Sequence, residues 1–498
     1  MPKVESFQDL TLPSRDGHVE KWRWLYQALR SAIIDRRLRP GSQLPSTRDL
    51  ARQQGLARGT VTAAYAQLLA EGFAFAQTGA GTFVSTGPAA AAPPPAAGAP
   101  RATGLTTRAS RALAGVSAHG APATHGRAFR VYEPALDLFP AERWARTAAH
   151  VLRRAPRALY GHGDPIGYLP LRRAIAEYVG PARGVRCVPE QVLITAGAQH
   201  ALSLLGRLLL DLGDAAWVED PGYPGVRQAW RAAGARLVHV PADAEGMRVS
   251  EGRRLAPHAR LAYVTPANQF PLGTVMSADR RLELLDWASA SHAWIVEDDY
   301  DAEYRYAGRP VASLQSVDRR GTVIYVGTFT KMLFNALRLG FMVLPEQLVD
   351  SFARARSIDD RHPPTLDQAT LTDFIVDGHF GRHVRRMRQA YAERLEVLLE
   401  SSDRALGGLL EVQRAGAGMR TIGWLTNARS DRPAAESALA HGLEVVPLSA
   451  FAEDVALRPG LVLGFASVPP AEIRRGVAVL ARALSGRSLP LRHFRVPG

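Results

Sequence analysis

Lys331 is the residue of this sequence whose type calls most for a chemical explanation. The chain has 61 basic residues, but only three are lysines, and the other two lie within the first 21 residues. Lys331 follows the apolar run 323–326, and Thr328 and Arg338 flank it with groups suited to phosphate. An amine can form a Schiff base with an aldehyde, whereas a guanidinium in practice does not. The segment therefore predicts a reactive amine beside a phosphate site rather than a surface lysine.

A carboxylate and a phenol are predicted to share one face of the segment 294–300. Side chains of a strand alternate between its faces, so Asp298 and Tyr300 point to one side and Asp299 to the other. A carboxylate can keep a pyridinium nitrogen protonated and a phenol can hydrogen-bond a ring oxygen, which are the roles that a pyridoxal site needs from its protein. A metal or salt-bridge cluster of acids is the alternative. No histidine pair lies nearby, so we predict no metal site.

Two further segments could contribute to such a site. Gly197, Ala198 and Gln199 lie between the apolar run 192–195 and an apolar helical pattern, and N–H groups at a helix start bind phosphate. Tyr223 follows another apolar run, and its ring could stack on a planar ligand. Each signal is weak alone, and ordinary loop chemistry explains it equally well.

These residues need a scaffold, and the second part of the chain has the pattern of one. From about residue 131 onward, apolar runs such as 261–264 alternate with helical patterns, which is typical of buried parallel strands separated by helices. The predicted fold class is α/β. The length of 498 residues allows about three globular units, or two units of which one is large. With 46% apolar and 22% charged residues, the composition excludes a wholly disordered or fibrous chain.

Charge and cysteine content bear on the binding partners and the cellular compartment of the protein. The net charge of +14 is a weak pointer to nucleic acid, because an arginine-biased genome would produce the same excess. The single cysteine, Cys187, allows neither an intrachain disulfide nor a cysteine metal cluster, and this fits a reducing cytoplasm. No apolar run of about 18 residues predicts a membrane span, and no apolar leader predicts secretion.

The chain is predicted to contain two domains joined by a linker. Residues 18–87 have the pattern of a small helical unit, and residues 131–498 form the α/β domain. Between them, residues 88–130 contain no acid, and their first part consists mostly of alanine and proline. Such a stretch cannot bury a core and is typical of a semi-stiff linker.

The small unit has the pattern of a helix–turn–helix followed by a wing. Helices are predicted over about 20–36, from Ser46 to Gly55 and from Arg58 to Glu71, before a glycine-tipped hairpin. In such a unit the start of the later helix enters the major groove. We expect Arg48, Arg58 and Thr60 to contact DNA from the helix starts, and Thr78 and Gly79 from the wing tip. A small helical domain that binds protein is the alternative.

The small unit also resembles the GntR-type winged-helix family. The matching pieces, in the right order, are Leu38-Arg39-Pro40-Gly41, Leu44-Pro45-Ser46-Thr47-Arg48-Asp49-Leu50-Ala51, Gly59-Thr60-Val61, Ala64-Tyr65, Leu68, Glu71-Gly72 and Gly79-Ala80-Gly81-Thr82-Phe83-Val84. The resemblance implies a dimer that binds double-stranded operator DNA. Many members have a polar residue where this chain has Gly59.

The large part, over about residues 130–485, looks like the fold-type I aminotransferases, which use pyridoxal 5′-phosphate. The resemblance implies that Lys331 forms the Schiff base, that Asp298 holds the pyridine nitrogen and that Tyr300 contacts the ring hydroxyl. It further implies that Tyr223 stacks on the ring. The phosphate ligands that it implies are Gly197, Ala198, Gln199, Thr328, Arg338 and, from the partner subunit of a homodimer, a tyrosine that Tyr160 matches.

Two departures from aminotransferases stand out. The usual Asn-Pro-x-Gly segment reads Phe270-Pro271-Leu272-Gly273 here. Aminotransferases also hold a substrate carboxylate with an arginine near the last strand, but residues 461–466 contain none.

The two resemblances together are those of the MocR-type regulators. For that family they imply a cytoplasmic, pyridoxal-phosphate-dependent transcription regulator whose large domain senses a small molecule, either an amino compound or the cofactor itself. A working aminotransferase with an added DNA-binding domain is the second reading. The third is a DNA-binding protein whose large domain is an inactive scaffold for dimerisation.

Overall fold

The structure is a computed structural model that describes residues 13, 19–86, 110, 127–306, 311–426 and 430–485. Contacts divide the chain into two compact units, residues 1–105 and 106–498. The predicted linker 88–130 lies outside the described residues apart from Ser110 and the last four positions. Within the described ranges, every helix is too short or too polar to cross a bilayer.

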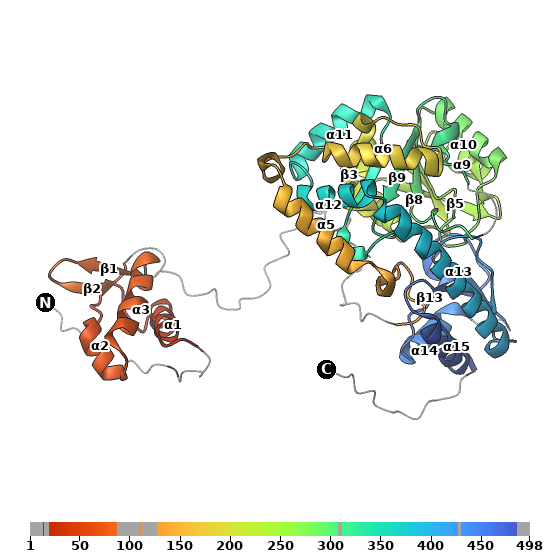
Figure 1. Ribbon diagram of the computed structural model, residues 1–498. Helices are drawn as coiled ribbons and strands as arrows, with labels where there is room; N and C mark the ends of the chain where they lie inside the picture. The colour runs from red at the N-terminus through yellow and green to blue at the C-terminus, as the bar shows by residue number, and fades with distance from the viewer. Residues whose placement is uncertain are drawn as a thin grey trace. The chain divides into compact units, whose positions relative to one another are not determined.

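The small unit is a three-helix bundle with a two-stranded antiparallel wing (Figure 1). The Ser46 side chain accepts a hydrogen bond from the Asp49 N–H at the start of the second helix, and Gly55 ends that helix with a φ of 65°. Leu25, Leu50 and Leu68 are fully buried between the helices. The elements predicted for this unit are therefore confirmed. Their bounds are α1 (Lys21–Ile34), α2 (Thr47–Gln54), α3 (Arg58–Ala70), β1 (Ala74–Gln77) and β2 (Gly81–Val84).

The large unit is built on an eight-stranded sheet with the strand order β3-β10-β9-β8-β7-β4-β5-β6. The central strands β9, β8, β7, β4 and β5 run parallel, whereas β10 and β6 run antiparallel to their neighbours. The α/β prediction is confirmed. The strands are β3 (Val192–Thr195), β4 (Ala215–Asp220), β5 (Arg236–Asp243), β6 (Gly246–Met247), β7 (Leu261–Val264), β8 (Trp294–Asp299), β9 (Val323–Thr328) and β10 (Gly340–Val343).

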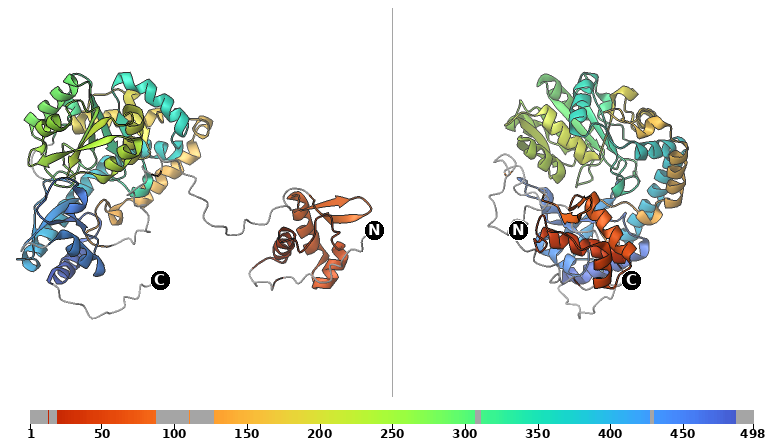
Figure 2. Two further views of the ribbon diagram at one scale, coloured as in Figure 1. Left: turned by 180° about the vertical axis from the view of Figure 1, so that it is seen from behind. Right: turned by 90° about the vertical axis from the view of Figure 1, so that its left-hand side faces the viewer.

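Helices cover both faces of this sheet (Figures 1 and 2). Val296 and Ile324 pack toward α7, α8 and α11, whereas Ile295 and Val323, one position earlier on each strand, pack toward α9 and α10. Burial on both faces explains why these strands are continuously apolar in the sequence. The helices mentioned are α7 (Ala198–Leu209), α8 (Pro224–Ala233), α9 (Val249–Leu255), α10 (Ala278–Ala290) and α11 (Glu346–Asp359).

A second sheet of four strands, in the order β11-β12-β14-β13, lies in the C-terminal part of the large unit. Phe129, at the end of the predicted linker, forms a bridge with Gly464 of β14. The strands are β11 (Leu410–Val412), β12 (Arg420–Leu425), β13 (Val446–Pro447) and β14 (Gly460–Gly464). The remaining helices are α5 (Ala141–Arg154), α6 (Leu169–Arg183), α12 (Thr365–Val376), α13 (His379–Ala405), α14 (Asp431–Ala440) and α15 (Pro470–Ser485), with short 3₁₀ turns η3 (Leu136–Leu138), η4 (Arg157–Tyr160), η5 (Pro189–Gln191), η6 (Gln315–Val317), η7 (Asn335–Leu337) and η8 (Leu448–Phe451).

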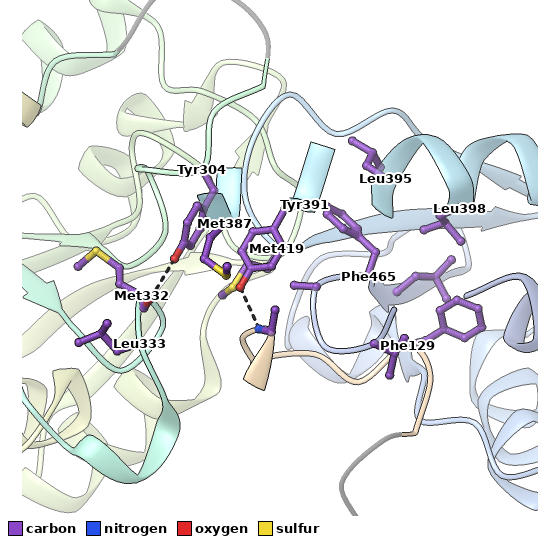
Figure 3. Packing of buried hydrophobic residues seen from close by; sticks show 14 of the residues in the cluster. Phe129, Tyr304, Met332, Leu333, Met387, Tyr391, Leu395, Leu398, Met419 and Phe465 are labelled. Atoms are coloured by element: carbon purple, nitrogen blue, oxygen red, sulfur yellow. Dashed lines mark hydrogen bonds between the residues drawn. The ribbon is translucent and has the colours of Figure 1, made fainter. Parts of the chain in front are cut away.

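One hydrophobic cluster joins the α13 helix to the loop that carries Lys331 (Figure 3). Tyr304 and Tyr391 are fully buried and meet edge to face with ring centroids 4.8 Å apart. The Tyr304 hydroxyl donates to the Met332 carbonyl at 3.4 Å, and the Tyr391 hydroxyl accepts from the Ala135 N–H at 3.0 Å. The loop after β9 is therefore held in place by the buried Tyr304, which in turn packs against Tyr391 of α13.

Candidate functional site

The predicted site residues gather at the carboxyl ends of the parallel strands. Tyr223 follows β4, Asn268 follows β7, Tyr300 follows β8 and Lys331 follows β9. Because neighbouring parallel strands end at the same edge of a sheet, the topology brings these loops together. Ligands of open α/β sheets bind at this edge.

Lys331 points its amine into this site. Its Nζ donates to the Tyr132 carbonyl oxygen at 2.6 Å and lies 5.3 Å from the centroid of the Tyr132 ring. Burial, together with the nearby Arg338 guanidinium, lowers the pKa of the Lys331 amine to about 8. An amine with this pKa is partly neutral near pH 7, so it can act as a nucleophile.

Asp298 is a buried carboxylate with one oxygen that lacks a hydrogen-bond partner among the described residues. Its Oδ2 accepts from the Tyr263 hydroxyl at 2.7 Å, whereas its Oδ1 is buried without a hydrogen-bond partner among the described residues. Burial raises the pKa of the Asp298 carboxyl to about 7. A buried polar atom without a partner is destabilising unless a ligand supplies one.

The neighbouring acid faces the other way, as strand alternation predicts. The Asp299 Oδ2 accepts from Arg183 at 2.6 Å and from the Tyr325 hydroxyl at 2.7 Å. Arg183 belongs to α6, on the opposite face of the sheet from α7. The Asp299 Oδ1 is also buried without a partner among the described residues, but Asp299 lies on the face of the sheet that α6 covers. Of the two acids, Asp298 therefore offers its free oxygen on the face of α7.

Three strands and a helix start form a cradle of hydrogen-bond donors. Thr328 of β9 pairs with Gly340 of β10, and Gly340 also pairs with the last residue of β3, from which the chain passes into α7. Gly197 has a φ of 85° at the N-terminus of α7, and a Cβ there would lie 3.1 Å from Nη2 of Arg338. The Arg338 Nη2 donates to the Ala196 carbonyl at 2.8 Å. This arrangement suits a phosphate.

Ala198 and Gln199 form the first turn of α7, but the Gln199 side chain is used elsewhere. Its Nε2 donates to the Gly225 carbonyl at 2.9 Å, and its Oε1 accepts from the Tyr223 hydroxyl at 3.3 Å. Gln199 therefore offers the cradle its backbone N–H, while its side chain positions the tyrosine.

Tyr223 caps the N-terminal end of α8 and belongs to a group of aromatic rings. Its centroid lies 5.9 Å from Phe270 and 6.4 Å from Tyr132, edge to face in both pairs. Phe270 stacks on Tyr132 at 5.5 Å and meets Phe451 edge to face at 5.0 Å. The rings provide apolar walls beside Lys331.

Sequence reasoning missed two residues of the site. Tyr132 has a φ of 77°, a conformation that is strained for a tyrosine, and its carbonyl holds the Lys331 amine. Arg420 is buried at the start of β12, opposite Gly464 of β14 in the strand register. The segment 461–466, which lacks an arginine, therefore pairs with the strand that carries one. The sequence signal for Arg420 was its position as the charged residue of the mostly apolar run 419–425.

Tyr160 does not join the site of its own chain. It ends η4, and 60% of its surface is exposed. Its hydroxyl donates to the Leu152 carbonyl at 3.1 Å.

The predicted DNA-contacting residues lie on the surface of the small unit. Arg48 in α2 and Arg58 in α3 are exposed, Thr60 is half-buried, and Thr78 and Gly79 are exposed at the wing tip. Among the residues that the structure describes, neither Arg48 nor Arg58 has an ion pair. The N-terminal turn of α3 has no acidic residue and no side-chain cap. Both the guanidinium groups and the helix start are therefore available to an anion.

Within the part of the chain that the structure describes, one group of side chains has the spacing of metal ligands: Asp220, His239 and Asp454 place ligand atoms within 4.8 Å of one another. The Asp220 oxygens, however, accept from the N–H groups of Glu453, Asp454 and Val455 at 2.8–3.0 Å. This carboxylate already has the structural role of holding the loop after η8.

Family comparisons match both units. Residues 129–480 match the family described as aminotransferase class I and II, and residues 23–84 match the bacterial regulatory proteins of the gntR family. Among solved structures, the α-aminoadipate aminotransferase LysN of Thermus thermophilus, complexed with N-(5′-phosphopyridoxyl)-L-leucine, aligns with a TM-score of 0.66. It is 31% identical, and the alignment covers 72% of this chain and 92% of LysN.

Relatives that match over nearly their whole length, and so across both units, include two regulators. The pyridoxine biosynthesis regulator PdxR of Corynebacterium glutamicum is 30% identical over 93% of this chain and 95% of its own length. MocR of Rhizobium meliloti, described as a probable rhizopine catabolism regulatory protein, is 40% identical over 485 residues, which are 96% of this chain and 97% of MocR. The chain has a GntR-type DNA-binding domain within residues 19–86, called the reader below, followed by an aminotransferase-fold domain. With these two domains in the order found in such regulators, the chain belongs to the MocR-type family of transcription regulators.

Proposed function

We propose that this regulator binds pyridoxal 5′-phosphate in its large domain and uses it to sense a small molecule, either an amino compound or the cofactor itself. The observation that carries the proposal is the unpartnered Oδ1 of Asp298, buried in the same site as a lysine of lowered pKa. A protonated pyridine nitrogen would supply the hydrogen bond that this oxygen lacks. The donor cradle, the aromatic walls and the amine match the remaining parts of the same ligand.

When bound, the cofactor supplies an aldehyde that a primary amine can attack. Lys331 offers the resident amine, and an incoming amino compound would compete with it for the same carbon. Asp298 would hold a proton at the ring nitrogen, and Tyr223 would line the space for the ring. The helix start at 197–199, Thr328 and Arg338 neutralise the phosphate. These contacts come from separate loops, so a change in how the ligand is held can move the loops relative to one another.

We further propose that the protein acts as a homodimer. Tyr160 has no role in its own chain's site but is exposed beside other apolar side chains: Leu152 is 51% exposed and Leu366 is 36% exposed. The η4 turn packs on α12, because Leu159 and Ala369 share a buried cluster and the Thr365 hydroxyl donates to the Leu159 carbonyl at 2.8 Å. A second copy covering these exposed side chains would bring Tyr160 to the partner's phosphate. Helix–turn–helix readers also bind paired half-sites as dimers.

In this proposal the reader contacts operator DNA in the cytoplasm through Arg48, Arg58, Thr60, Thr78 and Gly79. Residues 88–130 join it to the sensing domain of 131–498. Ligand binding then shifts the equilibrium between arrangements of the two readers by its differential affinity for them, typically about 1–3 kcal/mol.

A working aminotransferase with an attached reader remains the second candidate, and Arg420 is the observation that favours it. A buried guanidinium beside the amine could hold a substrate carboxylate. Release of a keto acid from an amino acid by the purified protein, at a rate that exceeds free cofactor, would support that reading.

The direct test is the absorbance spectrum of the purified protein after loading with pyridoxal 5′-phosphate. We expect a visible band that dialysis does not remove. Lys331→Ala should abolish this band, whereas the matched control Lys21→Ala, an exposed lysine of α1, should retain it. A band that survives in Lys331→Ala would refute the assignment of the amine.

Sensing is tested by binding in two directions. Because coupling between two sites is reciprocal, operator DNA must change the affinity for the small molecule by the factor by which the small molecule changes the affinity for DNA. Calorimetric titration of candidate amino compounds with and without operator fragment measures this factor. Equal affinities would favour the inactive-scaffold reading.

A further inference from the structure

Arg420 connects the small sheet to the phenol of the site. It is the first residue of β12, and its side chain is only 6% exposed. Its Nη2 donates to the Tyr300 hydroxyl oxygen at 2.5 Å and to the Gln269 carbonyl at 3.3 Å. Its guanidinium also lies 4.4 Å from the Phe270 ring centroid. The cation is therefore fixed in one orientation against the oxygen atom of Tyr300.

The contacts of Arg420 belong to a closed ring of four residues. The Tyr300 hydroxyl donates to the Asn268 carbonyl at 2.7 Å, and the Asn268 amide Nδ2 donates to Asp301 Oδ1 at 2.8 Å. The other oxygen of Asp301 lies 3.5 Å from Nη1 of Arg420, which closes the ring. Since Asp301 is 1% exposed, this ion pair is shielded from solvent. Electrostatic effects are larger in such surroundings than in water.

The charge pattern around the Tyr300 oxygen follows from this ring. Arg420 from β12 faces it directly, while Asp301 and Asp298 approach it from the β8 segment. The Lys331 amine, from the loop after β9, interacts with both of these acids. Burial raises the pKa of the Tyr300 phenol, and Arg420 opposes that rise. Arg420 is the cation that hydrogen-bonds the phenol oxygen itself.

We propose that Arg420, balanced by Asp301, is a positioning residue that makes the Tyr300 phenol a stronger hydrogen-bond donor and so favours the deprotonated ring oxygen of the bound cofactor. The inference rests on the proposed cofactor site and concerns the protonation state of the cofactor bound there. Without the cofactor the Tyr300 O–H donates to the Asn268 carbonyl, so serving the cofactor requires this O–H to turn from that carbonyl to the ring oxygen. A phenol whose oxygen accepts from a guanidinium gives up its proton more readily, so it donates more strongly to an oxygen placed beside it. The cofactor's acid–base state is then set in part by β12, a strand of the other sheet.

The test uses the loaded full-length protein and follows its visible absorbance from pH 5 to 10. Arg420→Met removes the cation, so the midpoint of the pH-dependent spectral change should rise by about 1 unit, as expected for loss of an opposite charge within hydrogen-bonding distance. Asp301→Asn leaves the cation unbalanced, so the midpoint should fall. Arg420→Lys keeps the charge and should give a smaller shift than Arg420→Met.

The control is Arg414→Met, because Arg414 is exposed and pairs with Glu396 just before β12. It should leave the midpoint unchanged. Equal midpoints in wild type, Arg420→Met and Asp301→Asn, or an absence of any pH dependence, would overturn the inference while the visible band itself upholds the cofactor site. If Arg420→Met folds too poorly to load, the downward shift in Asp301→Asn decides the question. Absence of the band from wild type would instead refute the proposed function.

Discussion

The DNA-binding unit and the proposed cofactor site hold their charged groups in opposite environments. In the small unit, Arg48 and Arg58 are exposed and have no ion pair among the described residues. In the large unit, Asp298 and Arg420 are buried and Lys331 is half-buried, and all three are held by contacts from segments distant in the sequence. The first arrangement presents charge to a large polyanion, and the second enforces one geometry around a small ligand.

Because of this difference, substitutions should affect binding and folding differently in the two units. A reader whose side chains make few internal contacts can lose one of them with little effect on folding, so mutations there should separate binding from stability. In the buried site, most polar groups have a structural partner. A substitution therefore affects the ligand alone only where a group lacks such a partner, as Oδ1 of Asp298 does.

Among effects on ligand binding, the largest that we expect is that of Asp298→Asn on cofactor affinity. The amide keeps the shape of the side chain but removes the charge facing the ring nitrogen. A hydrogen bond to a charged group contributes about 1.5–3 kcal/mol, so the Kd for pyridoxal 5′-phosphate should rise about 10- to 150-fold. Absorbance titration of the empty protein measures this.

Asp299→Asn is the matched control, one residue along the same strand. It breaks the buried pair with Arg183, so it should lower the stability of the large unit by roughly 3–5 kcal/mol, with little change in cofactor Kd once folded. Equal weakening of cofactor binding by both variants would remove the distinction between the two faces of β8.

On the exposed side, Arg58→Ala should weaken specific DNA binding by about 1–3 kcal/mol if the guanidinium contacts a guanine edge. Thermal unfolding should stay within about 0.5 kcal/mol of wild type, because the side chain is on the surface. Gel-shift titration against an operator selected from random DNA measures the first effect.

Arg52→Ala is the control, since this exposed arginine of α2 pairs with Asp49 at 3.5 Å. Wild-type affinity and specificity in Arg58→Ala would contradict the placement of the α3 start in the groove.

The same contrast explains how much the sequence could predict. In the reader, the Ser46 cap, the apolar spacing of α3 and the glycine-tipped wing are local signals, and each element lies within a few residues of its predicted bounds. For the large unit, strand alternation was sufficient to assign Asp298 and Asp299 to opposite faces.

The rest of the site depends on contacts between distant segments. Lys331 binds a carbonyl 199 residues away, and Arg420 binds a tyrosine 120 residues away. No periodicity within a single segment encodes such a pair. The backbone strain at Tyr132 is likewise imposed by packing, since a tyrosine has no local preference for a φ of 77°.

The buried environment also predicts a pH dependence of cofactor loading. Burial lowers the pKa of Lys331 to about 8, so the neutral, reactive fraction should grow about tenfold between pH 7 and pH 9 and then level off. Stopped-flow absorbance of the empty protein mixed with pyridoxal 5′-phosphate measures the rate. An exposed lysine would instead give a rate that keeps rising toward pH 10.4. That result would place Lys331 in the same class of environment as the reader's arginines.

The smallest expected effect concerns the reader's own fold. Ser46 accepts from the Asp49 N–H at 3.1 Å and donates to the Asp49 carboxylate at 2.6 Å. Ser46→Ala removes this cap and should lower the free energy of unfolding by about 1 kcal/mol. Urea unfolding of residues 1–105, followed by the fluorescence of Trp22 and Trp24, measures it. Ser42→Ala removes only a loop contact to the Arg39 carbonyl and should change stability less. Equal losses in the two variants would mean that local capping does not stabilise the reader. In the full-length protein loaded with pyridoxal 5′-phosphate, neither substitution should change the visible absorbance.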